Sequence, residues 1–130
     1  MPRIFALKGP QGSGKSKTLK GVCEKLLDAF PRANICAVLN IKKGTTIGIE
    51  SNNHVGQTER SLKLFLNERC DVIVCATSTR GISVKAVKST FAKRKITWLD
   101  LPKSASESAK KKARRAMVDK IFKKVNTIVK

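Results

Sequence analysis

Three glycines fall within the eight residues Gly9-Pro10-Gln11-Gly12-Ser13-Gly14-Lys15-Ser16, and this segment constrains the fold more than any other part of the chain. Glycine adopts backbone conformations that other residues avoid, so the segment predicts a tight turn. Residues 4–7 are apolar and predict a short buried strand, whereas residues 17–27 have the pattern of a helix. An order of strand, glycine-rich turn and helix is typical of α/β domains.

Residues 9–16, called the glycine loop below, contain the residue types that a bound triphosphate requires. Backbone N–H groups wrap around phosphate oxygens where no Cβ atom obstructs them, and the positive end of the following helix faces the anion. Lys15 is expected to reach the β- and γ-phosphates, and Ser16 to offer its hydroxyl to Mg²⁺. We therefore expect Mg-ATP, or another nucleoside triphosphate, to be bound by Gly9, Gln11, Gly12, Ser13, Gly14, Lys15, Ser16 and Lys17.

The length of 130 residues predicts one domain that covers residues 1–130. No apolar run approaches the roughly 18 residues that cross a bilayer, so we expect no membrane partner. The chain enters its first strand without the pattern of a signal peptide, which favours a cytoplasmic protein. The four cysteines lack Cys-x-x-Cys spacing, which favours small core residues over zinc ligands or disulfides.

The net charge is +19, from 28 basic and 9 acidic residues. Such an excess attracts anions and makes a nucleic acid or another polyanion a plausible partner; the alternative is a solvated lysine-rich surface. Part of the excess lies in the last predicted helix, where Ala109, Ala113, Met117, Ile121, Val125 and Ile128 form an apolar stripe. We expect this stripe to pack and the basic face, with its cluster at residues 110–115, to be solvated.

Hydrophobic periodicity predicts that strands and helices alternate along the rest of the chain. Thr58, Ser83 and the pattern Ser104-x-x-Glu107 are suitable caps for three further helices. The remaining strands are expected at residues 35–41, 46–50, 72–76 and 95–100, the first two as a hairpin and the very apolar third in the sheet centre. We therefore expect an α/β three-layer sandwich with a mostly parallel five-stranded sheet and one antiparallel edge strand.

An enzyme that uses a triphosphate needs a carboxylate that holds Mg²⁺ or orients the attacking group. The central strand ends without an acid, which leaves two candidates at the ends of other strands, Glu50 and Asp100. We expect Glu50 to act in catalysis and, with Ser16, to hold Mg²⁺. The alternatives are an exposed strand-end carboxylate for Glu50 and a turn residue before Pro102 for Asp100.

The direction of the strand at residues 46–50 decides whether Glu50 lies near the glycine loop. If the first helix ends near Leu27, about nine residues remain, enough to return along the helix, and the strand with Glu50 then runs parallel to the first strand. If the helix ends at Phe30, the linker is shorter and Glu50 lies at the opposite edge. We favour the first version because Pro31 suits an extended linker and the next crossover is then right-handed.

This order of glycine loop, helix, antiparallel edge strand and parallel strand with an acid resembles the small GTPases. In that family a Gly-Gln pair follows the acid, as Gly56-Gln57 follows Glu50 here at some distance, but the guanine-specifying Asn-Lys-x-Asp motif is absent. The chain also resembles short P-loop ATPases of bacteria, phages and mobile elements over about its whole length, in residues 48–51 (Gly-Ile-Glu-Ser) and 74–81. These resemblances imply a P-loop NTPase fold with ATP as the nucleotide.

Those ATPases often carry Gly-Asp after that serine, whereas this chain has Asn52-Asn53-His54. Either Glu50 replaces the acid, or hydrolysis is weakened. His54 itself either orients water or phosphate or is a solvated loop residue.

The chain further resembles nucleoside and nucleotide kinases in its size and glycine loop. In that family an arginine that follows a strand end contacts the phosphates, and Arg80 follows the strand at residues 72–76. The resemblance implies a catalytic Arg80 that stabilises charge on the transferred phosphoryl group; the alternative is a surface arginine.

Two classes of function fit these patterns. The first is an ATPase or a small phosphotransferase of the nucleoside or nucleotide kinase kind. The second is a DNA- or RNA-binding module whose basic surface is switched by the nucleotide. A third class, an ATP-dependent assembly subunit, would need a partner surface that the sequence does not identify.

Overall fold

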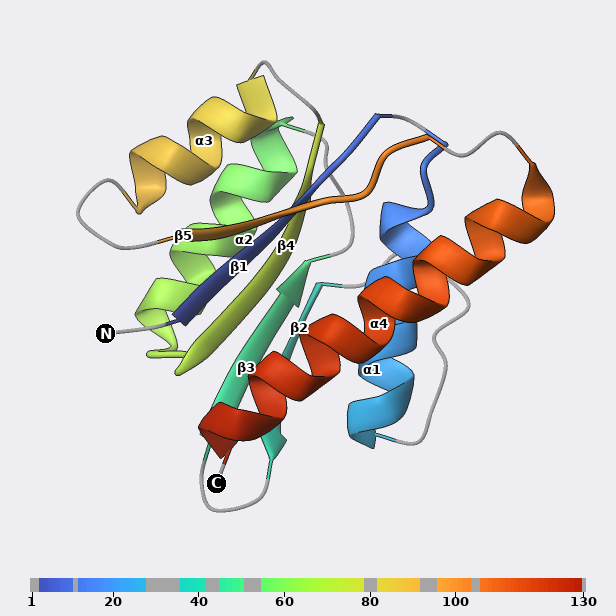
Figure 1. The fold of residues 1–130 in the computed structure, drawn as a ribbon. Helices are drawn as coiled ribbons and strands as arrows, with labels where there is room; N and C mark the ends of the chain where they lie inside the picture. The colour runs from blue at the N-terminus through green and yellow to red at the C-terminus, as the bar shows by residue number, and fades with distance from the viewer. Residues whose placement is uncertain are drawn as a thin grey trace.

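The structure is a computed structural model that describes residues 3–10, 12–27, 36–41, 45–50, 55–78, 82–91, 96–103 and 106–129. Strands and helices alternate along these residues after the first hairpin (Figure 1). In chain order the elements are β1 (Arg3–Lys8), α1 (Lys15–Leu27), β2 (Cys36–Ile41), β3 (Thr45–Glu50), α2 (Val55–Asn67), β4 (Val72–Thr77), α3 (Ile82–Thr90), β5 (Ile96–Asp100) and α4 (Glu107–Val129).

The strands form one sheet in the order β2-β3-β4-β1-β5. Strands β3, β4, β1 and β5 run parallel, whereas β2 pairs antiparallel with β3 as the first half of a hairpin. The predicted α/β class with a largely parallel sheet is therefore confirmed over the described residues. The very apolar strand β4 is buried at each of its positions, because it lies in the sheet centre as predicted.

The parallel strands end at one edge of the sheet, called the carboxyl edge below. Lys8 at the end of β1 stands opposite Thr77 of β4 and Asp100 of β5, and Glu50 of β3 stands opposite Cys75. Helix α1 ends at Leu27 and β3 is parallel to β4, so the favoured direction of the strand with Glu50 is confirmed. The glycine loop and Glu50 consequently lie at the same edge of the sheet.

Helices cover both faces of the sheet, α1 and α4 on one and α2 and α3 on the other (Figure 1). Alternate side chains of β1 point into the two cores: Phe5 and Leu7 pack with α1 and α4, and Ile4 and Ala6 pack with α2 and α3. Each fully buried leucine or isoleucine stabilises the fold by roughly 1.5–3 kcal/mol. The sheet is thus the common scaffold for the loops at its carboxyl edge.

Three predicted helix caps differ from the structure. Thr58 and Ser83 lie inside α2 and α3, because both helices begin earlier than predicted. Each residue added to a helix contributes one backbone hydrogen bond, whereas an internal threonine or serine costs only a few tenths of a kcal/mol. For α4 the cap is Ser106, whose hydroxyl accepts a hydrogen bond from the N–H of Ala109 at 3.2 Å; Ser104 lies outside the described residues.

No helix in the described part of the chain has the length and apolar character needed to cross a membrane. The cysteines at positions 23, 70 and 75 are buried, as predicted for small core residues. They act as small core residues, and burial raises the pKa of each thiol.

Candidate functional site

The glycine loop turns sharply between β1 and α1. Gly12 has a φ of 81° and Gly14 a φ of 101°, and the N–H of Ser13 donates to the carbonyl oxygen of Pro10 at 3.2 Å. Side chains other than glycine are strained at such φ values by about 1–2 kcal/mol. The two glycines therefore permit a compact turn that delivers the chain directly into α1.

Gly9 holds the loop against the neighbouring strands. Its N–H donates to the carbonyl oxygen of Thr77 at 3.3 Å, and a Cβ atom at position 9 would lie 2.3 Å from the carbonyl oxygen of Leu101. The N–H of Leu101 in turn donates to the carbonyl of Lys8 at 2.8 Å. Only glycine fits between these backbones, so the start of the loop is fixed to both β4 and the segment after β5.

Lys15 carries its charge into the loop. The residue is only 7% exposed, and its Nζ donates to the carbonyl oxygens of Gly9 and, at 3.2 Å, of Pro10. Burial lowers the pKa of the Lys15 ammonium group, while the two carbonyl contacts orient it. The loop thus holds an oriented cation that the sequence pattern predicts to serve phosphate oxygens.

Two buried hydroxyls at the carboxyl edge have no hydrogen-bond partner among the described residues. They are Oγ of Ser13, a residue 2% exposed, and Oγ1 of the fully buried Thr77. The Ser13 hydroxyl lies 2.8 Å from the place where a Gly9 Cβ would stand, so it points into the loop. A buried polar group without a partner costs about 1–3 kcal/mol, and its presence at a loop lined by N–H groups fits a polar ligand.

The amino end of α1 strengthens this preference for an anion. The first turn of a helix carries N–H groups without partners inside the helix, together with the positive end of the helix dipole. The first turn of α1 contains no acidic residue. The N–H and the hydroxyl of Thr18 both donate to the carbonyl oxygen of Gly14, at 2.9 and 2.7 Å. The loop and helix end together fit a phosphate group.

Glu50 is fully buried at the end of β3, so the alternative of an exposed strand-end carboxylate is wrong. Its Oε2 accepts a hydrogen bond from the hydroxyl of Ser61 in α2 at 2.5 Å. The packing around Gly48 explains this contact. A Cβ atom on Gly48 would lie 2.5–2.8 Å from ring atoms of Phe65, so the glycine lets α2 approach β3, and Ser61 lies one turn before Phe65.

Glu50 affects the pKa of its neighbour in the sheet. Cys75 stands opposite Glu50, and burial together with this carboxylate raises the pKa of the Cys75 thiol to about 12. The thiol therefore stays protonated at neutral pH and packs as an apolar group.

Asp100 lies at the same edge but in a different environment. Its side chain is 72% exposed, and its Oδ1 is 3.7 Å from Nζ of Lys8, whose ammonium also lies 5.6 Å from the ring centroid of Trp98. An exposed pair of this kind contributes about 0–1 kcal/mol. Of the two candidate acids, only Glu50 is both buried and oriented by a second side chain.

No group of three or more His, Cys, Asp and Glu side chains is placed to hold a metal within the described ranges. Mg²⁺ is usually held by one or two protein oxygens together with phosphate oxygens of the substrate, and the predicted protein oxygens are those of Ser16 and Glu50. Ser16 is half-buried in the first turn of α1. Gln11, His54 and Arg80 lie outside the described residues.

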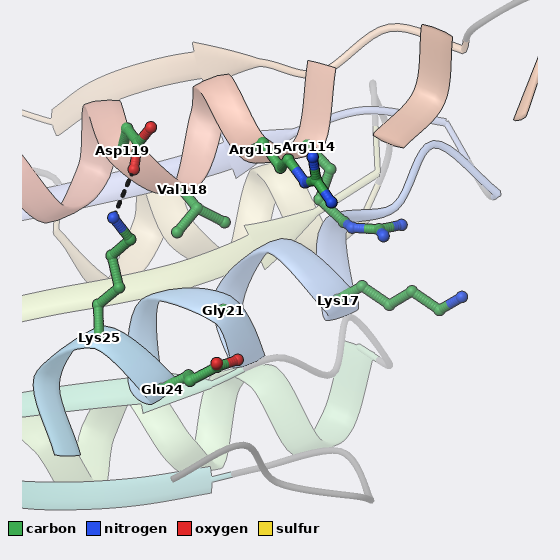
Figure 2. A pocket seen from close by; sticks show the side chains of 8 residues that line it. All are labelled: Lys17, Gly21, Glu24, Lys25, Arg114, Arg115, Val118 and Asp119. Atoms are coloured by element: carbon green, nitrogen blue, oxygen red, sulfur yellow. Dashed lines mark ion pairs between the residues drawn. The ribbon is translucent and has the colours of Figure 1, made fainter. Parts of the chain in front are cut away.

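A groove of about 520 Å³ runs between α1 and α4, beside the glycine loop (Figure 2). One end is closed by an ion pair between Lys25 and Asp119 at 2.7 Å. At the other end the side chains of Arg114 and Arg115 extend from α4 toward the amino end of α1, where Lys17 lies. The cationic end of the groove is therefore the end nearest to the loop.

The contact of Ser61 with Glu50 and the packing of α4 beside the glycine loop were not predicted from the sequence. Ser61 is a polar residue on the buried face of α2, four residues before Phe65, and this placement is the signal that could have indicated a partner. The expectation that the basic cluster of α4 is entirely solvated is wrong for Lys110 and Arg114, which are half-buried beside Gly14, while Ala109 of the predicted apolar stripe is exposed.

Comparisons of the chain with protein-family models, with curated proteins and with solved structures found no match.

Proposed function

We propose that this protein binds Mg-ATP, or another nucleoside triphosphate, in the glycine loop and transfers its terminal phosphoryl group to water or to a small acceptor, within a P-loop NTPase fold. One observation carries the proposal: a buried, oriented Lys15 lies inside a turn built from two glycines of positive φ, directly before the amino end of a helix. This combination places a cation and backbone donors around one space, as phosphate recognition requires.

Residues of the chain fit each part of such a substrate. The loop N–H groups and Lys15 suit the β- and γ-phosphates, and the unpartnered Ser13 hydroxyl provides a further donor. Ser16 suits Mg²⁺ bound to the same phosphates. Glu50 suits a water ligand of that ion, or the attacking hydroxyl, because its carboxylate is held by Ser61 at the carboxyl edge.

The proposed reaction breaks the bond between the γ-phosphorus and the oxygen that links it to the β-phosphate, and forms a bond from phosphorus to the attacking oxygen. Glu50 accepts a hydrogen bond from the attacking group and receives its proton in hydrolysis or transfer. Lys15 stabilises the charge that develops on the β–γ oxygens. Arg80, outside the described residues, remains a predicted further cation at the phosphates.

Calorimetric titration with Mg-ATP tests the binding step. Lys15→Ala removes an ammonium group that makes charge-assisted hydrogen bonds, so we expect at least about tenfold weaker binding. Lys63→Ala is the matched control, since Lys63 is an exposed lysine of α2 that pairs with Glu59 at 3.0 Å away from the loop. Equal affinities for the Lys15→Ala variant and the control would contradict the site.

The two outcomes of turnover are separated by incubation of the wild-type protein with γ-labelled ATP and a panel of nucleosides and nucleotides. Release of labelled phosphate alone identifies an ATPase, and label on an acceptor identifies a phosphotransferase. Binding without either product would contradict the enzymatic part of the proposal.

Nucleic-acid binding is a second candidate function. Helix α4 carries eight basic and two acidic residues, and its basic side chains line the cationic end of the groove next to the glycine loop. A polyanion on α4 would then lie beside the nucleotide, which supports a switch between the two ligands.

A further inference from the structure

Two cations of α4 occupy positions that belong to the inward face of this helix. Val118, Ile121 and Val125 are buried in the core with α1, and Lys110 and Arg114 continue the same face at four-residue spacing toward the amino end of α4. Both are half-buried, whereas their neighbours Lys111, Lys112 and Arg115 are exposed. The inward stripe of α4 thus changes from apolar residues to cations where the helix passes the loop.

The point that these cations reach is Gly14 of the glycine loop. A Cβ atom on Gly14 would lie 3.8 Å from Cε of Lys110 and 3.9 Å from Cδ of Arg114. The charged groups stand only one to three bonds beyond these carbon atoms. Lys110 and Arg114 therefore lie beside the loop at Gly14, where the loop has no side chain of its own.

Neither cation forms an ion pair with an acidic side chain in the part of the chain that the structure describes. Like charges at four-residue spacing on a helix repel each other, and partial burial removes some of the water that screens them. Asp119, at the far end of the groove, pairs with Lys25 (Figure 2), and Glu107 in the first turn of α4 forms no ion pair with either cation within the described residues. This arrangement fits an anion between the two cations and the loop.

We infer that Lys110 and Arg114 bind the phosphates of the nucleotide held by the glycine loop, so that α4 provides the second cationic wall of the site. The inference rests on the proposed function, because it assigns further residues to the same phosphate group. Three cations then surround the phosphates: Lys15 from inside the loop, and Lys110 and Arg114 from the flank at Gly14. Lys111, Lys112 and Lys120 of the same helix are exposed.

The chain offers matched controls that remove the same charge from the same helix. Lys110→Gln is compared with Lys111→Gln, and Arg114→Gln with Lys120→Gln, each by calorimetric titration with ATP, ADP, AMP and adenosine; Lys111 and Lys120 are both exposed. A charge-assisted hydrogen bond to phosphate corresponds to roughly a tenfold to hundredfold change in affinity. We expect a loss of this size for ATP with each inward variant, a smaller loss as phosphates are removed, none for adenosine, and a change below about threefold for the controls.

Other results would overturn the inference and not the proposed function. If wild type binds ATP and Lys15→Ala does not, but Arg114→Gln binds like Lys120→Gln, the flank cations play no part. An equal loss for adenosine and ATP would assign Arg114 to the nucleoside, and loss of oligonucleotide binding with unchanged ATP affinity would assign both cations to nucleic acid. Circular dichroism melting of each variant verifies the fold, and Arg114→Lys is expected to retain part of the ATP affinity because it keeps the charge.

Discussion

Lys15 and Glu50 are both buried, but their charges are compensated by different kinds of group. Lys15 contacts two backbone carbonyl oxygens of the loop that it serves, whereas Glu50 accepts a hydrogen bond from a side chain of another element, Ser61. A buried charge is costly unless such partners are present. The two buried groups lie at the same edge of the sheet, which supports the proposed phosphoryl transfer.

Glu50→Gln tests the role of this carboxylate at the residue scale. The amide has the same shape and still accepts a hydrogen bond from Ser61, but it neither takes a proton nor attracts Mg²⁺ as strongly. We expect phosphate turnover at saturating Mg-ATP to fall about 100- to 10,000-fold, the usual contribution of a general base, with ATP affinity changed less than about threefold.

Asp100→Asn is the control for Glu50→Gln, because Asp100 is an exposed carboxylate at the same edge. Its turnover should stay close to that of wild type. If Asp100→Asn loses turnover and Glu50→Gln does not, the catalytic carboxylate has been assigned to the wrong strand.

At the scale of elements, the strands and helices follow from local pattern, whereas their partners do not. The apolar run of β4 and the glycine loop before α1 each indicate one structure, so both were predicted within one or two residues. The cap of α4 was misplaced because Ser104, Ser106 and Ser108 all offer hydroxyls. The choice among them depends on where the chain leaves β5, which is a tertiary property.

The same distinction between local pattern and tertiary packing applies to the candidate site. Residues 9–16 carry a local pattern, and the direction of β3 follows from the length of the linker before it. The contact between Ser61 and Glu50 depends on the rotation of α2 about its axis, and the approach of Lys110 and Arg114 to Gly14 depends on where α4 crosses α1. Neither rotation nor crossing is encoded in a short segment, because both are set by packing such as that of Phe65 on Gly48.

Gly48→Ala tests the contact that sets the position of α2. The added Cβ would lie 2.5 Å from Cγ of Phe65, so helix or strand must shift, and we expect the free energy of unfolding to fall by about 1–3 kcal/mol. The same shift should separate Ser61 from Glu50. Urea unfolding measures the loss of stability, and Gly48→Ala should cost less in a Phe65→Ala background because the ring atoms that clash are then absent.

Gly12→Ala is the matched control for Gly48→Ala. No atom lies within 4 Å of a Cβ at position 12, so only the strain of the positive φ remains, about 1–2 kcal/mol, and Phe65→Ala should not reduce it. Additive effects of Gly48→Ala and Phe65→Ala would show that the ring does not limit the approach of α2.

At the scale of the whole molecule, the charge of +19 exceeds what a nucleotide site needs. Lys15, Lys110 and Arg114 lie at the glycine loop, whereas Lys111, Lys112, Lys120 and Lys123 of α4 are exposed. The two groups share no residue, so a polyanion bound by the exposed lysines would not compete with the nucleotide for the same side chains. This separation makes the second candidate function testable on its own.

Binding of a short DNA or RNA duplex at two salt concentrations is the corresponding measurement. A complex with about four phosphate contacts loses roughly 100-fold in affinity between 50 and 200 mM salt, because counterions are released on binding. We expect this loss for wild type, and a smaller salt dependence for a variant with Lys111→Glu, Lys112→Glu and Lys120→Glu, which should keep its ATP affinity. Duplex affinity that is independent of salt, or equally strong in that variant, would rule out these exposed side chains as a polyanion surface.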